Sequence, residues 1–337
     1  MTIPERPREY RVSPETAGAV LATLRRHVGS MTWSEARKHL AGRRIAVNGI
    51  LCMEEGRRVV AGDVLTLRTR ALPAPPEDRD VQILFLDPHI VVAHKPSGML
   101  SLRHPGDVEW SRQKKDRQPA LEESLQRLIH QRERRAVKDH PSAPLLAVHR
   151  IDRETSGILV FARNEQAQQV LISQFAAHAP TRRYLCLIPG WIPAQTIRSR
   201  QIRDRGDGLR GSSADAARGR LMVTHLWPLR RIGRYSEVEC RLETGRTNQI
   251  RIQLAELGHP IAGDVKYRGA FGGSPLADES QAPRLALHAA ELGFLHPVSG
   301  ESLHYSLPWP RDMLALIRRL QSGGRPPHPG AAGAKNP

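Results

Sequence analysis

The chain has 337 residues, enough for one large domain with a smaller one, or two of similar size. Its 51 Lys and Arg against 34 Asp and Glu give a formal net charge of +17, which favours a polyanionic partner, above all nucleic acid. No apolar run approaches the roughly 20 residues of a membrane-spanning helix, and the first ten residues lack the apolar centre of a signal peptide. Charge alone does not separate a nucleic-acid-binding protein from one that is merely rich in arginine.

The cysteines and histidines give no sign of a disulfide framework or a metal site. Cys52, Cys186 and Cys240 are isolated and odd in number, which fits the reducing cytoplasm. The 15 histidines do not fall into the spacings of a metal-binding helix. We therefore expect no metal.

Residues 17–70 have the pattern of a compact unit. Apolar spacing predicts a helix over 16–28, and Ser34 can cap a second helix that runs through Leu40. A strand over 43–47 leads into the tight-turn pair Asn48-Gly49, and the turn at 62–63 precedes an alternating strand over 64–67. The Pro-rich stretch that follows is typical of a linker.

The rest of the chain is rich in strands. The pattern predicts strands over 83–86, 90–93, 158–162, 184–188, 221–227, 236–243, 285–295 and 302–307, helices over 121–138 and 165–177, and a loop over 104–120. Many strands with few helices indicate an α+β fold, with a mixed and mainly antiparallel sheet, rather than a doubly wound one. The expected organisation is a small α+β domain at 1–70, a linker at 71–80, a large domain at 81–320 and a disordered tail at 321–337.

One polar run, residues 149–157, lies between two apolar segments and therefore occupies a loop on a rigid scaffold. Its carboxylate, Asp152, is flanked by Arg150 and Arg153. Neighbouring cations lower the pKa of a carboxyl group and keep it ionised as a nucleophile. An Arg-Asp-Arg pattern by itself is more often a salt-bridged turn.

A second polar cluster spans residues 244–252. If it is a strand, Gln249 and Arg251 share one side; if it is a helix, Thr247 and Arg251 align instead. In both cases Gly245-Arg246-Thr247 supplies donors suited to a phosphate or a base edge. A glycine turn with surface arginines is the plainer alternative.

The two clusters in this order resemble the RluA-type family of pseudouridine synthases. The resemblance covers roughly residues 81–310. The matching pieces are Lys95-Pro96-Ser97-Gly98, the run at 149–157, Arg183-Tyr184 before an apolar strand ending in Gly190, Thr244 through Arg251, Leu287-His288-Ala289, and His296-Pro297 through Pro308.

The resemblance implies that uridine in RNA becomes pseudouridine, with no cofactor, metal or energy source. It makes Asp152 the nucleophile, towards either the ribose or the pyrimidine ring. Tyr184 would pack on the target base and Arg251 would pair with the catalytic aspartate. Arg150 would fill the gap left by the flipped nucleotide and offset part of the unstacking cost. Further substrate contacts are expected from Lys95, Thr155, Arg246, Thr247 and Gln249.

Two departures from the family pattern concern substrate contacts. Asn248 stands where the family usually has His, so we expect altered contacts and retained chemistry. The segment 99–103 and the polar stretch up to Pro119 are also atypical.

The N-terminal unit resembles the S4 RNA-binding domain, through its two short helices, the run Ala46-Val47-Asn48-Gly49, and Val59 with Gly62-Asp63-Val64. The usual Arg-Leu-Asp opening is absent. The resemblance implies a basic face that grips structured RNA, formed by Arg25, Arg26, Arg37, Lys38, Arg43 and Arg44. The alternative is a solvated helix face on a small folding module.

Together these features predict a monomeric, cytoplasmic RNA pseudouridine synthase that acts on ribosomal RNA or tRNA, with no membrane partner. The alternative is a catalytically degenerate relative that holds RNA during ribosome assembly. A nuclease is disfavoured because no metal-binding carboxylate cluster is visible.

Overall fold

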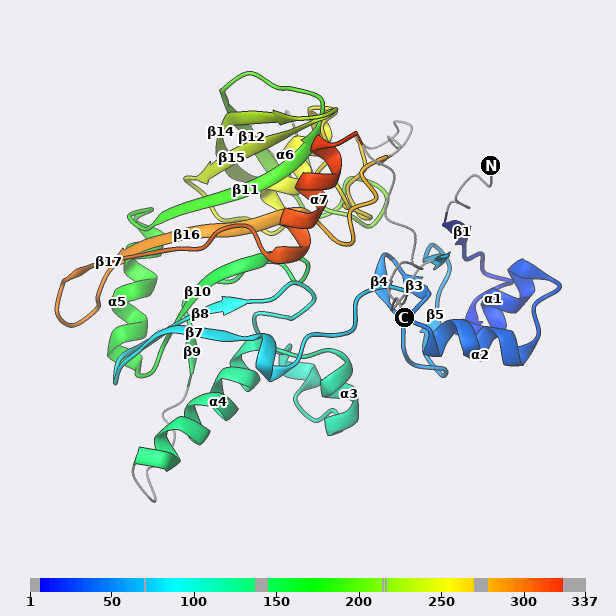
Figure 1. Cartoon of the computed structure of the whole chain (residues 1–337), viewed down its shortest axis with the longest axis horizontal. Coiled ribbons are helices and arrows are strands. Elements are labelled where there is room, and N and C mark those ends of the chain that lie inside the picture. Colours follow the sequence, from blue (N-terminus) through cyan, green and yellow to red (C-terminus); the bar gives the residue numbers. More distant parts are fainter. Residues whose placement is uncertain are drawn as a thin grey trace, which may run out of the picture. The chain divides into compact units, whose positions relative to one another are not determined.

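A computed structural model describes residues 7–69, 71–136, 145–213, 215, 217–269 and 278–323. The chain forms two compact units (Figure 1). The first comprises the residues up to Pro75 together with Ser111–Arg117, and the second comprises Pro76–Trp110 and the residues from Gln118 onward. The expected disordered tail lies almost wholly outside the described residues, as does the end of the helix expected over 121–138.

The N-terminal unit combines short helices with short strands. Four strands form an antiparallel sheet in the order β1-β6-β3-β4, and β2 pairs with β5. The bounds are β1 Arg8–Arg11, β2 Gly18–Ala19, α1 Val20–Val28, α2 Trp33–Ala41, β3 Ile45–Val47, β4 Ile50–Leu51, β5 Arg58–Val59, β6 Val64–Leu67 and α3 Arg112–Arg117. Helix α1 buries Leu21 and Leu24 against Ala36 of α2 and Ile45 of β3.

Turn and cap chemistry explains where these elements begin. Asn48 and Gly49 have φ of 51° and 76°, the positive values that a two-residue hairpin between β3 and β4 requires. The cap of α2 is Thr32, so the expectation of Ser34 was wrong. The Thr32 hydroxyl accepts the Glu35 N–H, and the Glu35 carboxylate accepts the Thr32 N–H, a reciprocal capping box.

The larger unit is built on an 11-stranded sheet, and its α+β class is as predicted. The main path is β13-β12-β14-β15-β11-β16-β10-β8-β7, with β17 beside β16 and β9 beside β10; all pairs are antiparallel except β10 with β16. The strands are β7 Gln82–Leu86, β8 Ile90–Lys95, β9 Leu146–Ala147, β10 Ser156–Ala162, β11 Thr181–Pro189, β12 Gln195–Ile202, β13 Gly211–Ser213, β14 Arg220–Ile232, β15 Tyr235–Leu242, β16 Leu287–Leu295 and β17 Ser302–Ser306. The helices are α4 Leu121–Ala136, α5 Glu165–Ala176, α6 Gln249–Glu256 and α7 Arg311–Gln321, with 3-10 turns at Asp78–Asp80 and Pro105–Asp107.

Three segments differ from expectation or settle an open choice. The stretch 104–120 is not all loop, because it contains a 3-10 turn and α3. Helix α3 buries no residue, so it carries no apolar periodicity to read. Helix α7 was not anticipated, and the run at 249–256 is a helix and not a strand.

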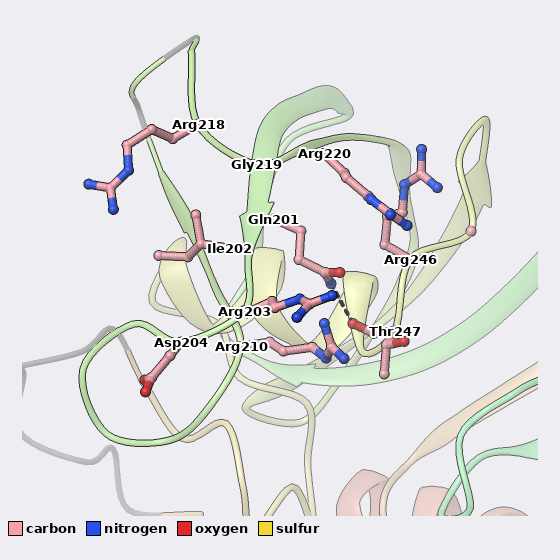
Figure 2. A pocket seen from close by; sticks show the side chains of 11 residues that line it. Gln201, Ile202, Arg203, Asp204, Arg210, Arg218, Gly219, Arg220, Arg246 and Thr247 are labelled. Carbon is pink, nitrogen blue, oxygen red and sulfur yellow. Dashed lines mark hydrogen bonds between the residues drawn. The ribbon is translucent and has the colours of Figure 1, made fainter.

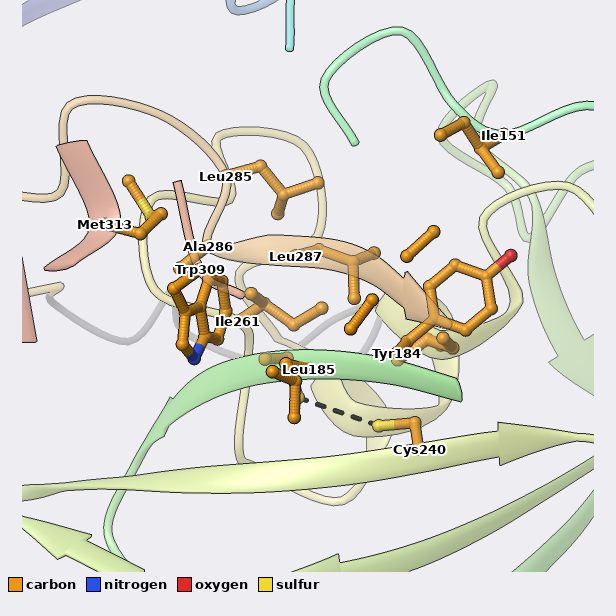
Figure 3. Close-up of a cluster of buried hydrophobic side chains, with 14 of the residues drawn as sticks. Ile151, Tyr184, Leu185, Cys240, Ile261, Leu285, Ala286, Leu287, Trp309 and Met313 are labelled. Carbon is orange, nitrogen blue, oxygen red and sulfur yellow. Dashed lines mark hydrogen bonds between the residues drawn. The ribbon is translucent and has the colours of Figure 1, made fainter. Parts of the chain in front are cut away.

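The sheet is covered on both faces, which is why its central strands are continuously apolar. Alternate residues of a strand point to opposite faces. Ile90 and Val92 of β8 pack with Leu171 of α5, while Val91 and Ala93 join the cluster that holds residues of α4 and α7. Figure 3 shows part of this second cluster, with Trp309 and Met313 beside Ile261 and Leu285–Leu287.

Candidate active site

Asp152 lies in the loop between β9 and β10. Hydrogen bonds join that loop to the end of β8 and to the segment that follows it. The Lys95 ammonium donates to the carbonyl of Arg153 at 3.1 Å and to that of Met99 at 2.7 Å. The Ser101 hydroxyl donates to the carbonyl of Ile151 at 2.8 Å, directly before Asp152. The loop carbonyls are therefore satisfied internally, and the carboxylate position is set by the scaffold.

Lys95 holds the backbone of this loop through hydrogen bonds. Its side chain is fully buried, and burial lowers the pKa of Lys95 to about 7, against the raising effect of Glu154 and Asp152. It was expected to contact substrate. Its nitrogen instead donates to three backbone carbonyls, those of Pro96, Met99 and Arg153.

Arg251 reaches the same place from α6. Its guanidinium makes a two-point ion pair with Asp264, at 2.8 and 2.9 Å. It lies 3.3 Å from the Glu154 carboxylate and 3.8 Å from that of Asp152. Arg251 therefore faces Asp152, as the resemblance implied, but its principal partner is Asp264. Neither Asp264 nor Glu154 was predicted as a site residue from the sequence, although Glu154 lies in the same polar run as Asp152.

The sequence predicted that neighbouring cations lower the pKa of Asp152, but its surroundings in the structure raise it. Burial raises the pKa of the Asp152 carboxyl, Arg251 opposes that rise, and the neighbouring Glu154 carboxylate adds to it. Burial would lower the pKa of Arg251, but Asp264 and the other carboxylates outweigh it and raise that pKa. The guanidinium therefore stays charged, and Asp152 holds its proton more tightly than an ordinary aspartate does.

The register of the sheet places Tyr184 two strands away from β10, the strand that follows the Asp152 loop. Gly157 of β10 pairs with Ala289 of β16, and Tyr184 of β11 also pairs with Ala289, from the other side. Strands lie about 4.8 Å apart, so the Gly157 and Tyr184 backbones are roughly 10 Å apart. A register shift between Arg183 and Tyr184 re-aims the tyrosine.

The Tyr184 ring is largely buried, with its hydroxyl pointing away from Leu185 and Cys240 in Figure 3. Burial raises the pKa of Tyr184 to about 12, with Arg182 opposing and Asp152 adding to the rise. The phenol is therefore a neutral proton donor at ordinary pH, able to face a base with its ring.

The remaining expected substrate residues fall into three places. Arg150 is exposed beside Asp152, whereas the Thr155 side chain is buried and its N–H donates to the Asp152 carbonyl at 3.1 Å. Gln249 is also buried. Its amide accepts from the Thr244 hydroxyl and the Arg246 N–H, and donates to the carbonyl of Val223. Gln249 thus shapes the turn that carries Arg246 and Thr247.

Arg246 and Thr247 line a pocket of about 710 Å³ (Figure 2). The next residue, Asn248, has a left-handed φ of 59°, a conformation that Asn tolerates better than most residues. Its amide oxygen accepts from Arg251 at 3.1 Å, and its nitrogen donates to the Tyr267 hydroxyl at 3.2 Å. Asn248 therefore links the pocket-lining turn to the Asp152 cluster.

The six basic residues singled out at the N-terminus all belong to the N-terminal unit, on α1, α2 and the turn after α2. Arg37 is paired with Glu55 at 2.7 Å, and Arg25 lies 4.4 Å from the centre of the Trp33 ring. Arg26, Lys38 and Arg44 are exposed, and Arg43 is half-buried.

Among the described residues, no group of three or more His, Cys, Asp or Glu side chains is arranged to hold a metal ion. Within the same parts of the chain, no helix has the length and apolar character needed to cross a membrane.

The chain is similar in sequence to a known family. Residues 89–256 match the family model described as RNA pseudouridylate synthase. The ribosomal large subunit pseudouridine synthase D of Zymomonas mobilis is 34% identical over 75% of this chain and 78% of its own length. The protein of the same name from Xanthomonas campestris is 36% identical, over 79% of this chain and 76% of its own.

The fold also matches a solved structure. Human RNA pseudouridylate synthase domain containing 4 superposes with a TM-score of 0.54 at 21% identity, over 71% of this chain and 92% of its own. At this identity the likeness concerns the fold alone.

Proposed function

The chain belongs to the RNA pseudouridylate synthase family, and from that premise we propose that it isomerises specific uridines of large-subunit ribosomal RNA, with Asp152 as the nucleophile. It is an isomerase of RNA. The choice of ribosomal RNA over tRNA rests on its relatives, several of which are named as large-subunit enzymes. We place its work in the cytoplasm, as a monomer.

The chemistry proposed for Asp152 requires a flipped uridine. Attack at the ribose anomeric carbon or at the pyrimidine ring leads to cleavage of the bond between N1 and the ribose. The base, free or still bonded to Asp152, rotates, and C5 bonds to the ribose. The bond that Asp152 formed breaks and restores its carboxylate, the proton on C5 is released, and N1 ends protonated. No atom is gained or lost overall, so the reaction needs no cofactor.

Three residues take the other roles. Arg251 stabilises the ionised Asp152 across 3.8 Å, and Tyr184 faces the base and handles protons. Arg150, exposed beside Asp152, fills the space that the flipped nucleotide leaves. The observation that carries the proposal is the meeting of Asp152 and Arg251 from elements 99 residues apart in the chain, at a buried site that a fastened loop holds in place.

For the N-terminal unit we propose an S4-like role as an RNA grip. It is supported by the basic residues of α1 and α2, of which Arg26 and Lys38 are exposed.

The test is tritium release from C5 of uridine-labelled RNA. Purified protein is incubated with large-subunit ribosomal RNA, and separately with tRNA, from a strain that lacks the gene. Release from ribosomal RNA alone is the expected result, and Asp152→Ala is expected to release none while it still binds RNA. Release from neither pool by folded protein would contradict the enzyme assignment. Activity that survives in Asp152→Ala would contradict the role of that residue.

A further inference from the structure

Five of the eleven residues that line the pocket at the turn before α6 are arginines. Arg203 and Arg210 come from the ends of the loop between β12 and β13, Arg220 opens β14, and Arg246 comes from the turn before α6. We call these four residues the arginine pocket. In Figure 2 the Arg203 and Arg210 side chains lie beside Thr247 and the end of Gln201, and those of Arg220 and Arg246 lie above them, whereas Arg218, which also lines the pocket, points away.

None of these four arginines forms an ion pair among the residues that the structure describes. In the same parts of the chain, the one hydrogen bond of their guanidinium groups runs from Arg246 to the carbonyl of Leu221, at 3.2 Å. The single acidic residue of the lining, Asp204, is used by its own loop, because its carboxylate accepts the N–H groups of Gly206 and Gly208. Like charges held together repel, so the pocket is arranged for an external anion.

The walls of the pocket are fixed in place. The Gln201 amide donates to the carbonyl of Thr247 at 2.7 Å, which joins β12 to the turn before α6. The Ser212 backbone N–H donates to the Glu256 carboxylate at 3.0 Å, which joins β13 to the end of α6. At Gly219 an added Cβ would lie 2.3 Å from the Gln201 carbonyl oxygen, so only glycine lets these two walls approach.

The pocket lining continues along the chain into the Asp152 cluster. Thr247 is followed by Asn248, which accepts a hydrogen bond from Arg251, and Arg251 is 3.8 Å from Asp152. The turn before α6 therefore contributes both to the pocket and to the residues around Asp152. Arginine suits phosphate because its planar fork donates two hydrogen bonds at once.

From this charge and this continuity we propose that the arginine pocket binds consecutive phosphates of the RNA strand that carries the target uridine. The proposal rests on the proposed function, and it concerns four residues of the pocket acting on the backbone and not on the base. The pocket would hold the strand while the uridine is flipped, so its loss weakens binding and leaves the chemical step intact.

The test uses the full chain with Arg203→Gln and Arg210→Gln combined. The matched control is Arg132→Gln with Arg234→Gln, which removes the same charge from exposed arginines, one on α4 and one at the turn between β14 and β15. The probe is a fluorescent 20-residue oligouridylate, titrated at several salt concentrations. Because the pocket variant neutralises two fewer phosphates, its salt slope should become shallower by roughly 1.4 and its affinity at moderate salt should fall roughly tenfold.

Two further measurements make the result specific. Wild-type tritium release from ribosomal RNA establishes the proposed function independently. With that shown, the pocket variant should raise KM by a factor similar to its loss of affinity, with kcat within about twofold of the control. A slope and KM equal to those of the control would overturn the pocket proposal alone. Displacement of the oligouridylate by polyglutamate at equal charge concentration would also overturn it, in favour of an acidic protein partner.

Discussion

Arg251 sits among more carboxylates than one guanidinium can neutralise. Asp264 takes the two-point contact, and Glu154 and Asp152 share what remains. The Asp152 carboxyl is half-buried, with 18% of its side chain exposed, and close to a second negative charge, so its pKa is raised. A nucleophile must be ionised, and the acid limb of the activity profile therefore reports this balance of charges.

Glu154→Gln is expected to move the acid limb of kcat/KM to lower pH. Glu154 raises the pKa of Asp152, and without that charge Asp152 ionises at a lower pH. The measurement is kcat/KM across the acidic range. Glu301→Gln, an exposed carboxylate before β17, serves as the control. If the acid limb of kcat/KM lies at the same pH as in the control, or at higher pH, Glu154 does not raise the pKa of Asp152.

Asp152→Asn is expected to be inactive yet to have a Tm at pH 8 at least as high as the wild type. The folded-state pKa of Asp152 lies above its unfolded value, so the stability linked to this group is present below the unfolded pKa and lost as pH rises through the folded pKa. At pH 8 the wild type therefore carries a half-buried charge that the amide lacks. Thermal unfolding at pH 8 and at successively lower pH should show the advantage of the amide narrowing as Asp152 takes up its proton. A Tm well below the wild type at pH 8 would contradict this.

At the scale of elements, the parallel pairing of β10 with β16 places Gly157, near the start of β10, beside Ala289. Ala289 pairs on its other side with Tyr184 of β11. The pairing of β10 with β16 depends on Gly157, where φ is +133° and an added Cβ would lie 2.2 Å from the carbonyl oxygen of Ala289. Backbone cannot yield as a flexible side chain can, so the strands would have to separate.

Gly157→Ala is therefore expected to lower the free energy of unfolding by on the order of 3 kcal/mol or more, from backbone strain together with overpacking. Gly300→Ala is the control, because Gly300 has a φ of +72° with nothing within 4 Å of an added Cβ. Gly300 also has a positive φ, but one close to the left-handed region that side chains can adopt, and no clash, so the change should cost about 1 kcal/mol. Urea unfolding of both variants gives the comparison. Equal losses would mean that the close approach to Ala289 is unimportant.

The sequence was informative about elements whose apolar pattern is strong. The strands around Ile158–Ala162 and Tyr184–Ile188 were expected nearly as they occur, because both faces are buried and the runs are continuously apolar. The run after Thr247 stayed ambiguous because its residues are buried all round, including Gln249, Arg251 and Gln253, so neither period is visible. Helix α7 does have helical apolar spacing, at Met313, Leu316 and Ile317, although no helix was predicted there.

The sequence indicated which residues to consider for the site, but not how they are arranged. Family motifs pointed to Asp152, Tyr184 and Arg251, and the structure brings these three towards one place. Sequence order carries no distances, so it could not show that Asp264 is the main partner of Arg251. It also could not show that Lys95 is turned inward to backbone carbonyls, or that loop 203–210 returns beside Arg246.

At the scale of the whole molecule, the net charge of +17 is divided between two units that each present arginines. Joint replacement of Arg25, Arg26, Arg37 and Lys38 by Ala is expected to weaken RNA binding and flatten its salt slope by up to roughly 3, as fewer phosphates are neutralised. Filter binding at several salt concentrations measures this. The same positions changed to Lys, with Lys38 kept, should restore the slope. An unchanged slope in the alanine variant, with folding intact, would mean that this unit does not grip RNA.

The grouping of Ser111–Arg117 with the N-terminal unit has a practical consequence. The backbone passes between the two units three times: after Pro75, after Trp110 and after Arg117. A truncation that starts at residue 76 would leave α3 without the elements it groups with, and a fragment that ends at residue 75 would lack it. The two units cannot be separated by a single cut, so any trimmed or chimaeric version of this enzyme must move both pieces together.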